Sequence, residues 1–124
     1  CLQANLEARG WPSISRPESQ VMLLASAGIT RQVEISKALG LTRQAINQTM
    51  KQLKSRGLIN ILPDPADGRC KIVAFADEGA EMRADALKII AQMEQEMMKR
   101  IGAKAVSAMH TALERDWGDI PVFD

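Results

Sequence analysis

The sequence predicts a mainly α-helical chain with one small β-hairpin, an α+β architecture. Apolar residues recur at three- and four-residue steps along most of the chain, which is the period of helices that bury one face. In a short central stretch the period changes, and two runs rich in Ile, Leu and Val flank a polar turn, as in a hairpin. A length of 124 residues allows one domain with one core and an appendage.

Three short helices are expected before the hairpin. The first runs from the capping box Ser15-Arg16-Pro17-Glu18 to Gly28. Thr30 is expected to cap the second, which Gly40 ends, and Thr42 caps the third, which runs to about Arg56. The apolar residues expected to face inward from these helices are Val21, Leu24, Ala25, Ile35, Leu39, Ile46, Met50 and Leu53.

The hairpin is expected from Leu58–Leu62 and Lys71–Phe75, with Pro63-Asp64-Pro65-Ala66-Asp67-Gly68 as its turn. A long amphipathic helix should follow from Asp77 to Ile101. Its apolar stripe outlasts any core that so short a chain can build, which predicts an obligate homodimer. Two more helices are indicated near the ends of the chain, by Leu2 and Leu6 and by Val106, Met109, Leu113 and Trp117.

Composition excludes several classes of protein. With 46% apolar and 25% charged residues the chain is not disordered, and its longest apolar run, Val21–Ala25, is too short for a membrane span. No secretory signal is visible, although the chain does not begin with Met. Cys1 and Cys70 make no disulfide framework, so a reducing cytoplasm is expected. Only 3% of residues are aromatic, which argues against the stacking surfaces of single-strand binders.

Charge is distributed unevenly along the chain. Residues 30–71 carry a local charge of +5, whereas residues 72–124 carry −4. A basic segment beside an acidic one is typical of a phosphate-facing module next to a part that does not bind phosphate. Charge alone is equally compatible with two solvated helix faces.

Two short helices joined by a tight turn and followed by a hairpin describe a winged helix-turn-helix. In its second helix the outward residues are rich in amides and cations: Arg43, Gln44, Asn47, Gln48 and Lys51. Gln and Asn bond adenine bidentately and Arg bonds guanine bidentately, so this face favours reading of double-stranded DNA over an ordinary solvated surface. We expect three segments: an N-terminal dimerisation segment (1–16), a winged helix-turn-helix DNA-binding domain (17–76) and C-terminal dimerisation helices (77–124).

The segment from Leu39 to Gln48, followed by Gly57-Leu58-Ile59, resembles the recognition helix of the MarR family of bacterial transcription regulators. The turn and Arg69 resemble that family's wing signature, Gly79 falls at its glycine after the wing, and Thr30 with Glu34-Ile35 matches the start of its first helix-turn-helix helix. The likeness covers residues 16–101, and the wing motif is its specific part.

The resemblance implies a homodimer with intertwined terminal helices, each subunit presenting one winged helix to half of a pseudo-palindromic operator. It also implies release of the DNA by a small aromatic or phenolic anion. From the residues themselves, no cofactor and no metal are expected. The DNA-contacting residues are expected to be Thr42, Arg43, Gln44, Asn47, Gln48 and Lys51 in the major groove, Asp67, Arg69 and Lys71 at the wing, and Thr30, Arg31 and Lys54 at phosphates.

The chain departs from the family pattern around the wing. Asn60-Ile61-Leu62 stands where basic residues are usual, and Ala76 replaces a capping Thr, so Asp77 begins the long helix. Arg69 has two interpretations: insertion into the minor groove with Asp67 orienting it, or a hairpin ion pair with Asp64 or Asp67.

Other residues carry weaker signals. The Met residues after position 80 are interpreted first as core, and second as a dimer seam with an adaptable ligand cavity. Cations beside Cys70 favour a lowered thiol pKa, but both cysteines are interpreted as non-sensing. His110 is interpreted as a partly buried histidine that makes no zinc site with the cysteines.

No motif for catalysis is present in the sequence, so the chain is not expected to be an enzyme. The expected function is a DNA-binding transcriptional regulator, and specifically a repressor. Two alternatives remain open: a winged helix that binds protein without an operator, and a repressor that senses oxidants through a cysteine.

Overall fold

The structure, a computed structural model, describes residues 1–123, which form two compact units, residues 1–87 and residues from 88 onward. Six helices and a two-stranded antiparallel hairpin are found in the part described. In chain order the elements are α1 (Leu2–Ala8), α2 (Arg16–Ser26), α3 (Gln32–Leu39), α4 (Arg43–Ser55), β1 (Ile59–Pro63), β2 (Lys71–Phe75), α5 (Asp77–Ile101) and α6 (Ala103–Glu114).

Capping residues set the start of two of the three central helices. The Ser15 hydroxyl accepts from the Glu18 amide at 3.4 Å and donates to the Glu18 carboxylate at 2.9 Å, which starts α2. The Thr42 hydroxyl accepts from the Ala45 amide at 3.1 Å and starts α4. The predicted cap at Thr30 is wrong: α3 begins at Gln32, and the N-cap position is Arg31, whose side chain makes no cap bond.

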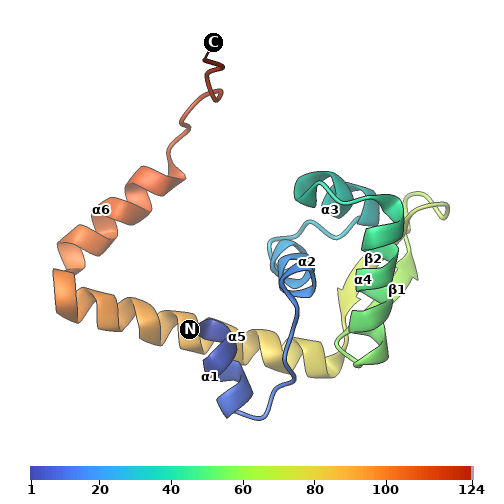
Figure 1. The fold of residues 1–124 in the computed structure, drawn as a ribbon, viewed down its shortest axis with the longest axis horizontal. Coiled ribbons are helices and arrows are strands. Elements are labelled where there is room, and N and C mark those ends of the chain that lie inside the picture. The colour runs from blue at the N-terminus through green and yellow to red at the C-terminus, as the bar shows by residue number, and fades with distance from the viewer. Residues whose placement is uncertain (124) are drawn as a thin grey trace. The chain divides into compact units, whose positions relative to one another are not determined.

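Pairing with the hairpin displaces the start of α3. The Val73 amide donates to the Thr30 carbonyl at 2.9 Å, and Arg31 forms an isolated antiparallel bridge with Ile72. Residues 30 and 31 therefore lie extended against β2, and the helix starts only after them. The hairpin register pairs Ile61 with Val73. In Figure 1 the green α4 and the hairpin lie beside each other, with α2 and α3 next to α4.

The core of the first unit is formed by residues that the sequence predicted to face inward. Ile35, Ile46, Met50 and Leu53 are at most 1% exposed. They are joined by Leu58, Ile59 and Val73 from the hairpin region. Leu24 and Leu39, also predicted to face inward, are only half-buried.

Gly79 is placed where no side chain fits. A Cβ built on it would lie 1.8 Å from the Leu58 carbonyl oxygen, so the first turn of α5 packs directly on the backbone at the start of β1. The Ala76 amide donates to the same carbonyl at 3.1 Å. The glycine expected after the wing is therefore required by backbone contact.

The segment before α2 contacts the first part of α5. Leu6 is buried, and the indole N–H of Trp11 donates to the Asp85 carboxylate at 2.8 Å. The Arg9 guanidinium lies 3.5 Å from the other oxygen of that carboxylate. These polar contacts hold the N-terminal segment within the first unit.

The second unit has few buried apolar side chains. Ile89 and Val106 are 2% exposed, whereas Met97, Ile101 and Met109 are between 42% and 53% exposed and Leu113 is 71% exposed. Gly102 separates α5 from α6, with φ +90°. The helix predicted to include Trp117 ends at Glu114, and the Trp117 indole instead donates to the Ala112 carbonyl at 2.6 Å. His110, predicted to be partly buried, is exposed and pairs with Glu94 at 2.5 Å.

Within residues 1–123, every helix is too short or too polar to cross a bilayer.

Candidate nucleic-acid interface

One face of α4 carries the amides and cations that the sequence predicted to face outward. Arg43, Gln44, Gln48 and Lys51 are exposed and Asn47 is half-buried. The opposite face holds the buried Ile46, Met50 and Leu53, so burial of the apolar face fixes which side chains face away from the core.

The start of α4 adds backbone donors to this face. Thr42 is exposed, and its hydroxyl oxygen is occupied by the Ala45 amide. The other amides of the first turn have no partner within their own helix and, with the helix dipole, they favour an anion. Thr42 therefore has a structural role in addition to any contact with DNA.

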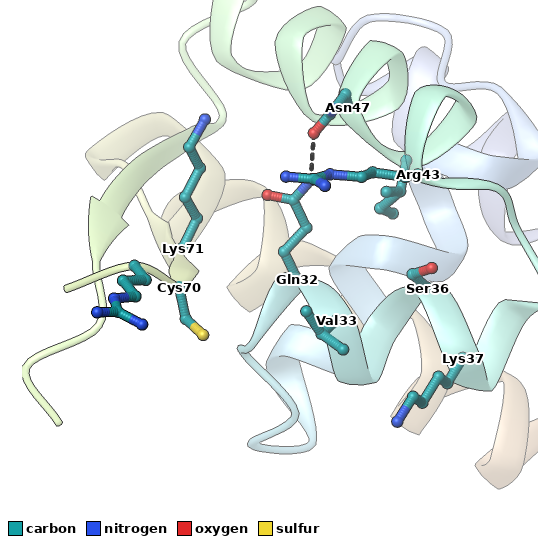
Figure 2. A pocket seen from close by; sticks show the side chains of 10 residues that line it. Gln32, Val33, Ser36, Lys37, Arg43, Asn47, Cys70 and Lys71 are labelled. Atoms are coloured by element: carbon teal, nitrogen blue, oxygen red, sulfur yellow. Dashed lines mark hydrogen bonds between the residues drawn. The ribbon is translucent and has the colours of Figure 1, made fainter. Parts of the chain in front are cut away.

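A groove of about 430 Å³ separates α3 and the start of α4 from the wing (Figure 2). Four of its lining residues are cations, and none of the ten carries a carboxylate. These ten residues are Gln32, Val33, Ser36, Lys37, Arg43, Ile46, Asn47, Arg69, Cys70 and Lys71. Its charge suits a polyanion, and its position unites the α4 face with the wing.

The wing turn is held by two aspartates that differ in environment. Asp64 is buried; its Oδ1 accepts from the Ala66 amide at 2.9 Å and its Oδ2 lies 2.8 Å from the Arg31 Nε. Asp67 is exposed, and its Oδ1 accepts from the Arg69 amide at 3.1 Å. The two carboxylates therefore fix the backbone of the turn.

The Arg69 guanidinium forms no ion pair with any residue from 1 to 123. The predicted alternative, in which Arg69 pairs with Asp64 or Asp67, is therefore not what the structure shows: Asp64 pairs with Arg31, and Asp67 bonds the Arg69 backbone. Arg69 lies exposed at the edge of the groove.

The three residues predicted to contact phosphate lie in different surroundings. Lys54 is exposed on α4. Thr30 is half-buried, with its carbonyl bonded to Val73. The side chain of Arg31 is 48% exposed but is paired with Asp64, so part of its charge is already neutralised within the protein.

One polar contact on the α4 face was not expected from the sequence. The Gln32 side-chain amide donates to the Asn47 Oδ1, as the dashed line in Figure 2 shows. The two residues lie fifteen positions apart and on different helices, and neither stands in a local pattern that marks the other. Only the packing of α3 against α4 brings them together.

Cys70 does not have the lowered pKa that its neighbouring cations suggested. Partial burial, the charge of Asp67 and the contact of its Sγ with the Asp67 Oδ2 at 3.7 Å raise the pKa of this thiol above its ordinary value. Cys1 is exposed, and its Sγ accepts from the Asn5 side-chain amide at 3.9 Å. Within the described residues, no group of three His, Cys, Asp or Glu side chains is arranged to hold a metal ion.

The sequence profile of the MarR family matches residues 15–69, from the cap of α2 to the wing arginine. This segment, residues 15–69, belongs to the MarR family. The chain is 27% identical over 94 residues to the transcriptional regulator HosA of Escherichia coli O111:H-, which covers 75% of this chain and 70% of that protein. MarR proteins are DNA-binding transcriptional regulators, and the prediction that the chain is not an enzyme is confirmed.

Solved structures of other transcriptional regulators share the fold. A mutant of MarR from E. coli in complex with operator DNA superposes with a TM-score of 0.65 at 23% identity, over 91% of this chain and 80% of that one. The PcaV regulator of Streptomyces coelicolor, in complex with its natural ligand, gives 0.58 at 25% identity over 82% of this chain and 73% of that one. The predicted winged helix-turn-helix fold is confirmed.

Proposed function

We propose that this MarR protein is a repressor that binds a pseudo-palindromic operator as a homodimer. The observation that carries the proposal is the exposed amide and cation face of α4 beside a groove lined by four cations and no carboxylate. Such a surface attracts phosphates through its charge and distinguishes bases through its amides. A MarR protein of the same fold has been solved with operator DNA bound.

Each part of the surface has an expected contact. Arg43, Gln44, Asn47, Gln48 and Lys51 face the major groove, with Thr42 at the helix start. Arg69 enters the minor groove, where a narrow A·T-rich segment attracts an unpaired guanidinium. Asp67 holds the Arg69 backbone, Lys71 adds charge at the wing, and the phosphate contacts are Lys54, Thr30 and the exposed part of Arg31.

Dimerisation is assigned to residues 1–16 and 77–124, which flank the winged helix-turn-helix of residues 17–76. The exposed Met97, Ile101, Met109 and Leu113 support this assignment, because one chain leaves them in water. A symmetric pair of chains would bury these residues and present two α4 helices to the two half-sites.

Control by a small aromatic or phenolic anion is the finer part of the proposal. Its support is that the related PcaV was solved in complex with its natural ligand. Such a ligand releases DNA only if it binds the DNA-free form of the dimer more tightly than the bound form. Calorimetry with aromatic carboxylates, with and without operator, measures this difference.

The decisive experiment selects bound duplexes from a random pool and then measures binding of the selected operator against salt. Gln48→Ala should weaken operator binding by about 1–3 kcal/mol with little effect on random DNA, because an amide reads base edges. Arg69→Ala should weaken both, remove a preference for flanking A·T pairs and lower the dimer's salt slope by about two. Failure to select any sequence would favour the protein-binding alternative.

A further inference from the structure

We propose that Gln32 is a positioning residue that fixes which base Asn47 reads, by holding the Asn47 amide with its nitrogen toward the DNA. The inference rests on the proposed function and deepens it, because it assigns a base class to one side chain. Gln32 lies on α3, outside the set of residues predicted to contact DNA.

The contact constrains the Asn47 side chain. An asparagine amide has one oxygen that accepts hydrogen bonds and one nitrogen that donates two. In this protein the Gln32 nitrogen donates to the Asn47 oxygen, and both residues are half-buried between α3 and α4 (Figure 2). With its oxygen turned to Gln32, Asn47 presents its NH2 group outward as a donor.

Gln44 and Gln48 differ from Asn47 in this respect. Within residues 1–123, neither of these two glutamines hydrogen-bonds another side chain, and both are exposed. They are free to offer an oxygen and a nitrogen together, which is the bidentate arrangement that adenine requires at N6 and N7. Asn47 is therefore the amide on this face whose orientation the protein sets before DNA arrives.

The backbone on the N-terminal side of Gln32 is anchored to the wing. Thr30 accepts from the Val73 amide, Arg31 bridges Ile72, and the Arg31 side chain pairs with the buried Asp64. These contacts fix the first turn of α3, from which Gln32 reaches Asn47. The Asn47 orientation thus depends on a segment held by the wing.

Because its oxygen is already bonded to Gln32, Asn47 can only donate to a base, and so it selects bases that carry an acceptor on their major-groove edge. Guanine offers O6 and N7 and thymine offers O4, whereas cytosine offers only an amino donor. At the base pair that Asn47 contacts, the protein should prefer G or T and reject C. Adenine gains only one bond, through N7, because its amino group finds no acceptor.

The test compares base preferences of variants on duplexes randomised at one position at a time. The position read by residue 47 is the one whose preference disappears in Asn47→Ala. In Gln32→Glu the carboxylate can only accept, so it takes the Asn47 NH2 and turns the oxygen toward the base. We expect preference at this position to change from G or T to the amino-bearing A or C, by roughly 5- to 150-fold.

A second variant tests whether the shift comes from the negative charge that Gln32→Glu introduces. Gln32→Ala releases Asn47, which can then bond adenine bidentately, so the preference should move to A. Gln52→Glu adds the same charge to exposed α4 and should weaken binding without changing the preference. Each variant is used at matched thermal stability, measured by unfolding.

The outcomes separate this inference from the proposed function. If the wild-type protein selects no sequence, the proposed function is wrong and the inference is lost with it. If Asn47→Ala relaxes one position but both Gln32 variants keep the wild-type preference there, only the inference is overturned. A preference shift that persists when Gln32→Glu is combined with Asn47→Ala also overturns it, because residue 32 would then contact the base directly.

Discussion

The two units of the protein differ in how their apolar side chains are covered. In residues 1–87, α2, α3, α4 and the hairpin contribute core side chains, such as Ile35, Leu53 and Val73, that are at most 2% exposed. In the second unit, Leu113, Trp117 and Ile120 are between 71% and 91% exposed. Residues 1–87 thus have a closed core, whereas residues from 88 onward leave apolar side chains in water, which is why we propose that they form the dimer contact.

Polar contacts show the same contrast. In the first unit, ion pairs join residues far apart in sequence: Arg31 with Asp64 at 2.8 Å and Arg56 with the buried Glu18 at 3.2 Å. In the second unit, Glu96 pairs with Lys99 and Arg100 of its own helix, and His110 on α6 pairs with Glu94 on α5. Exposed pairs within one helix contribute only about 0.3–0.5 kcal/mol. The pairs of the first unit join separate elements, whereas those of Glu96 stay within one helix.

The largest effect is expected where the second unit is broken. Two charges in Met109→Glu combined with Leu113→Glu should dissociate the dimer and reduce operator affinity by at least about 100-fold, because they would be buried without partners. Sedimentation gives the oligomeric state and a DNA titration gives the affinity. Ser107→Glu with Thr111→Glu, on the opposite face of α6, is the matched control and should stay dimeric. Dissociation of both double variants alike would contradict the assignment of this face.

Breaking the closed unit should cost stability. Gly79→Ala would force a Cβ against the Leu58 carbonyl, so we expect a loss of about 1–3 kcal/mol in the free energy of unfolding. Denaturant unfolding measures it. Gly68→Ala is the control, since a Cβ there meets nothing within 4 Å and should change stability by less than about 0.5 kcal/mol. Equal stability of the two variants would show that the contact is relaxed in solution.

Much of the first unit could be predicted from the sequence, because its signals are local. Ser15 and Thr42 cap helices as expected, and Ile46, Met50 and Leu53 fall inward by their spacing alone. The expected cap at Thr30 failed because a tertiary contact, the pairing of residues 30 and 31 with β2, competes with it. The prediction that the last helix includes Trp117 was wrong because the apolar spacing continues past Glu114, where α6 ends.

The site was less predictable than the fold because its contacts join elements that are distant in the sequence. The sequence indicated which α4 residues face outward, but not that Gln32 engages Asn47 or that Arg31 is paired with Asp64. Both contacts join distant elements, and neither residue type favours one partner by sequence alone. The contacts of individual residues with DNA stay predictions.

A smaller effect should follow from the ion pair behind the wing. Asp64→Asn keeps the side-chain shape but removes its charge from Arg31, which can rehydrate because it is half-exposed. We expect a loss of about 1–2 kcal/mol in stability. Asp67→Asn, in the exposed turn, is the control and should cost less than about 0.5 kcal/mol. If thermal unfolding showed the same loss of stability for Asp64→Asn and Asp67→Asn, the buried ion pair of Asp64 would contribute no additional stability.

The smallest effect concerns Cys70. Because its pKa is raised, its thiol should stay protonated at neutral pH and react with iodoacetamide more slowly than a free cysteine in a peptide. The rate for Cys70 should rise at a higher pH than the rate for a cysteine in a peptide. Asp67→Asn should move this rise to lower pH. The rate is measured by mass spectrometry of the Cys70 peptide. A rate above that of the peptide at neutral pH would restore the oxidant-sensing alternative.

The two tryptophans fall one in each unit, and the chain contains no tyrosine. Trp11 is half-buried, with its indole bonded to Asp85, whereas Trp117 is 72% exposed. Their emission maxima should differ, with Trp11 emitting at the shorter wavelength because its indole is less exposed to water. Replacing Trp117 with phenylalanine would leave a single emitter in the first unit. The protein therefore carries its own optical label for following that unit separately from the other.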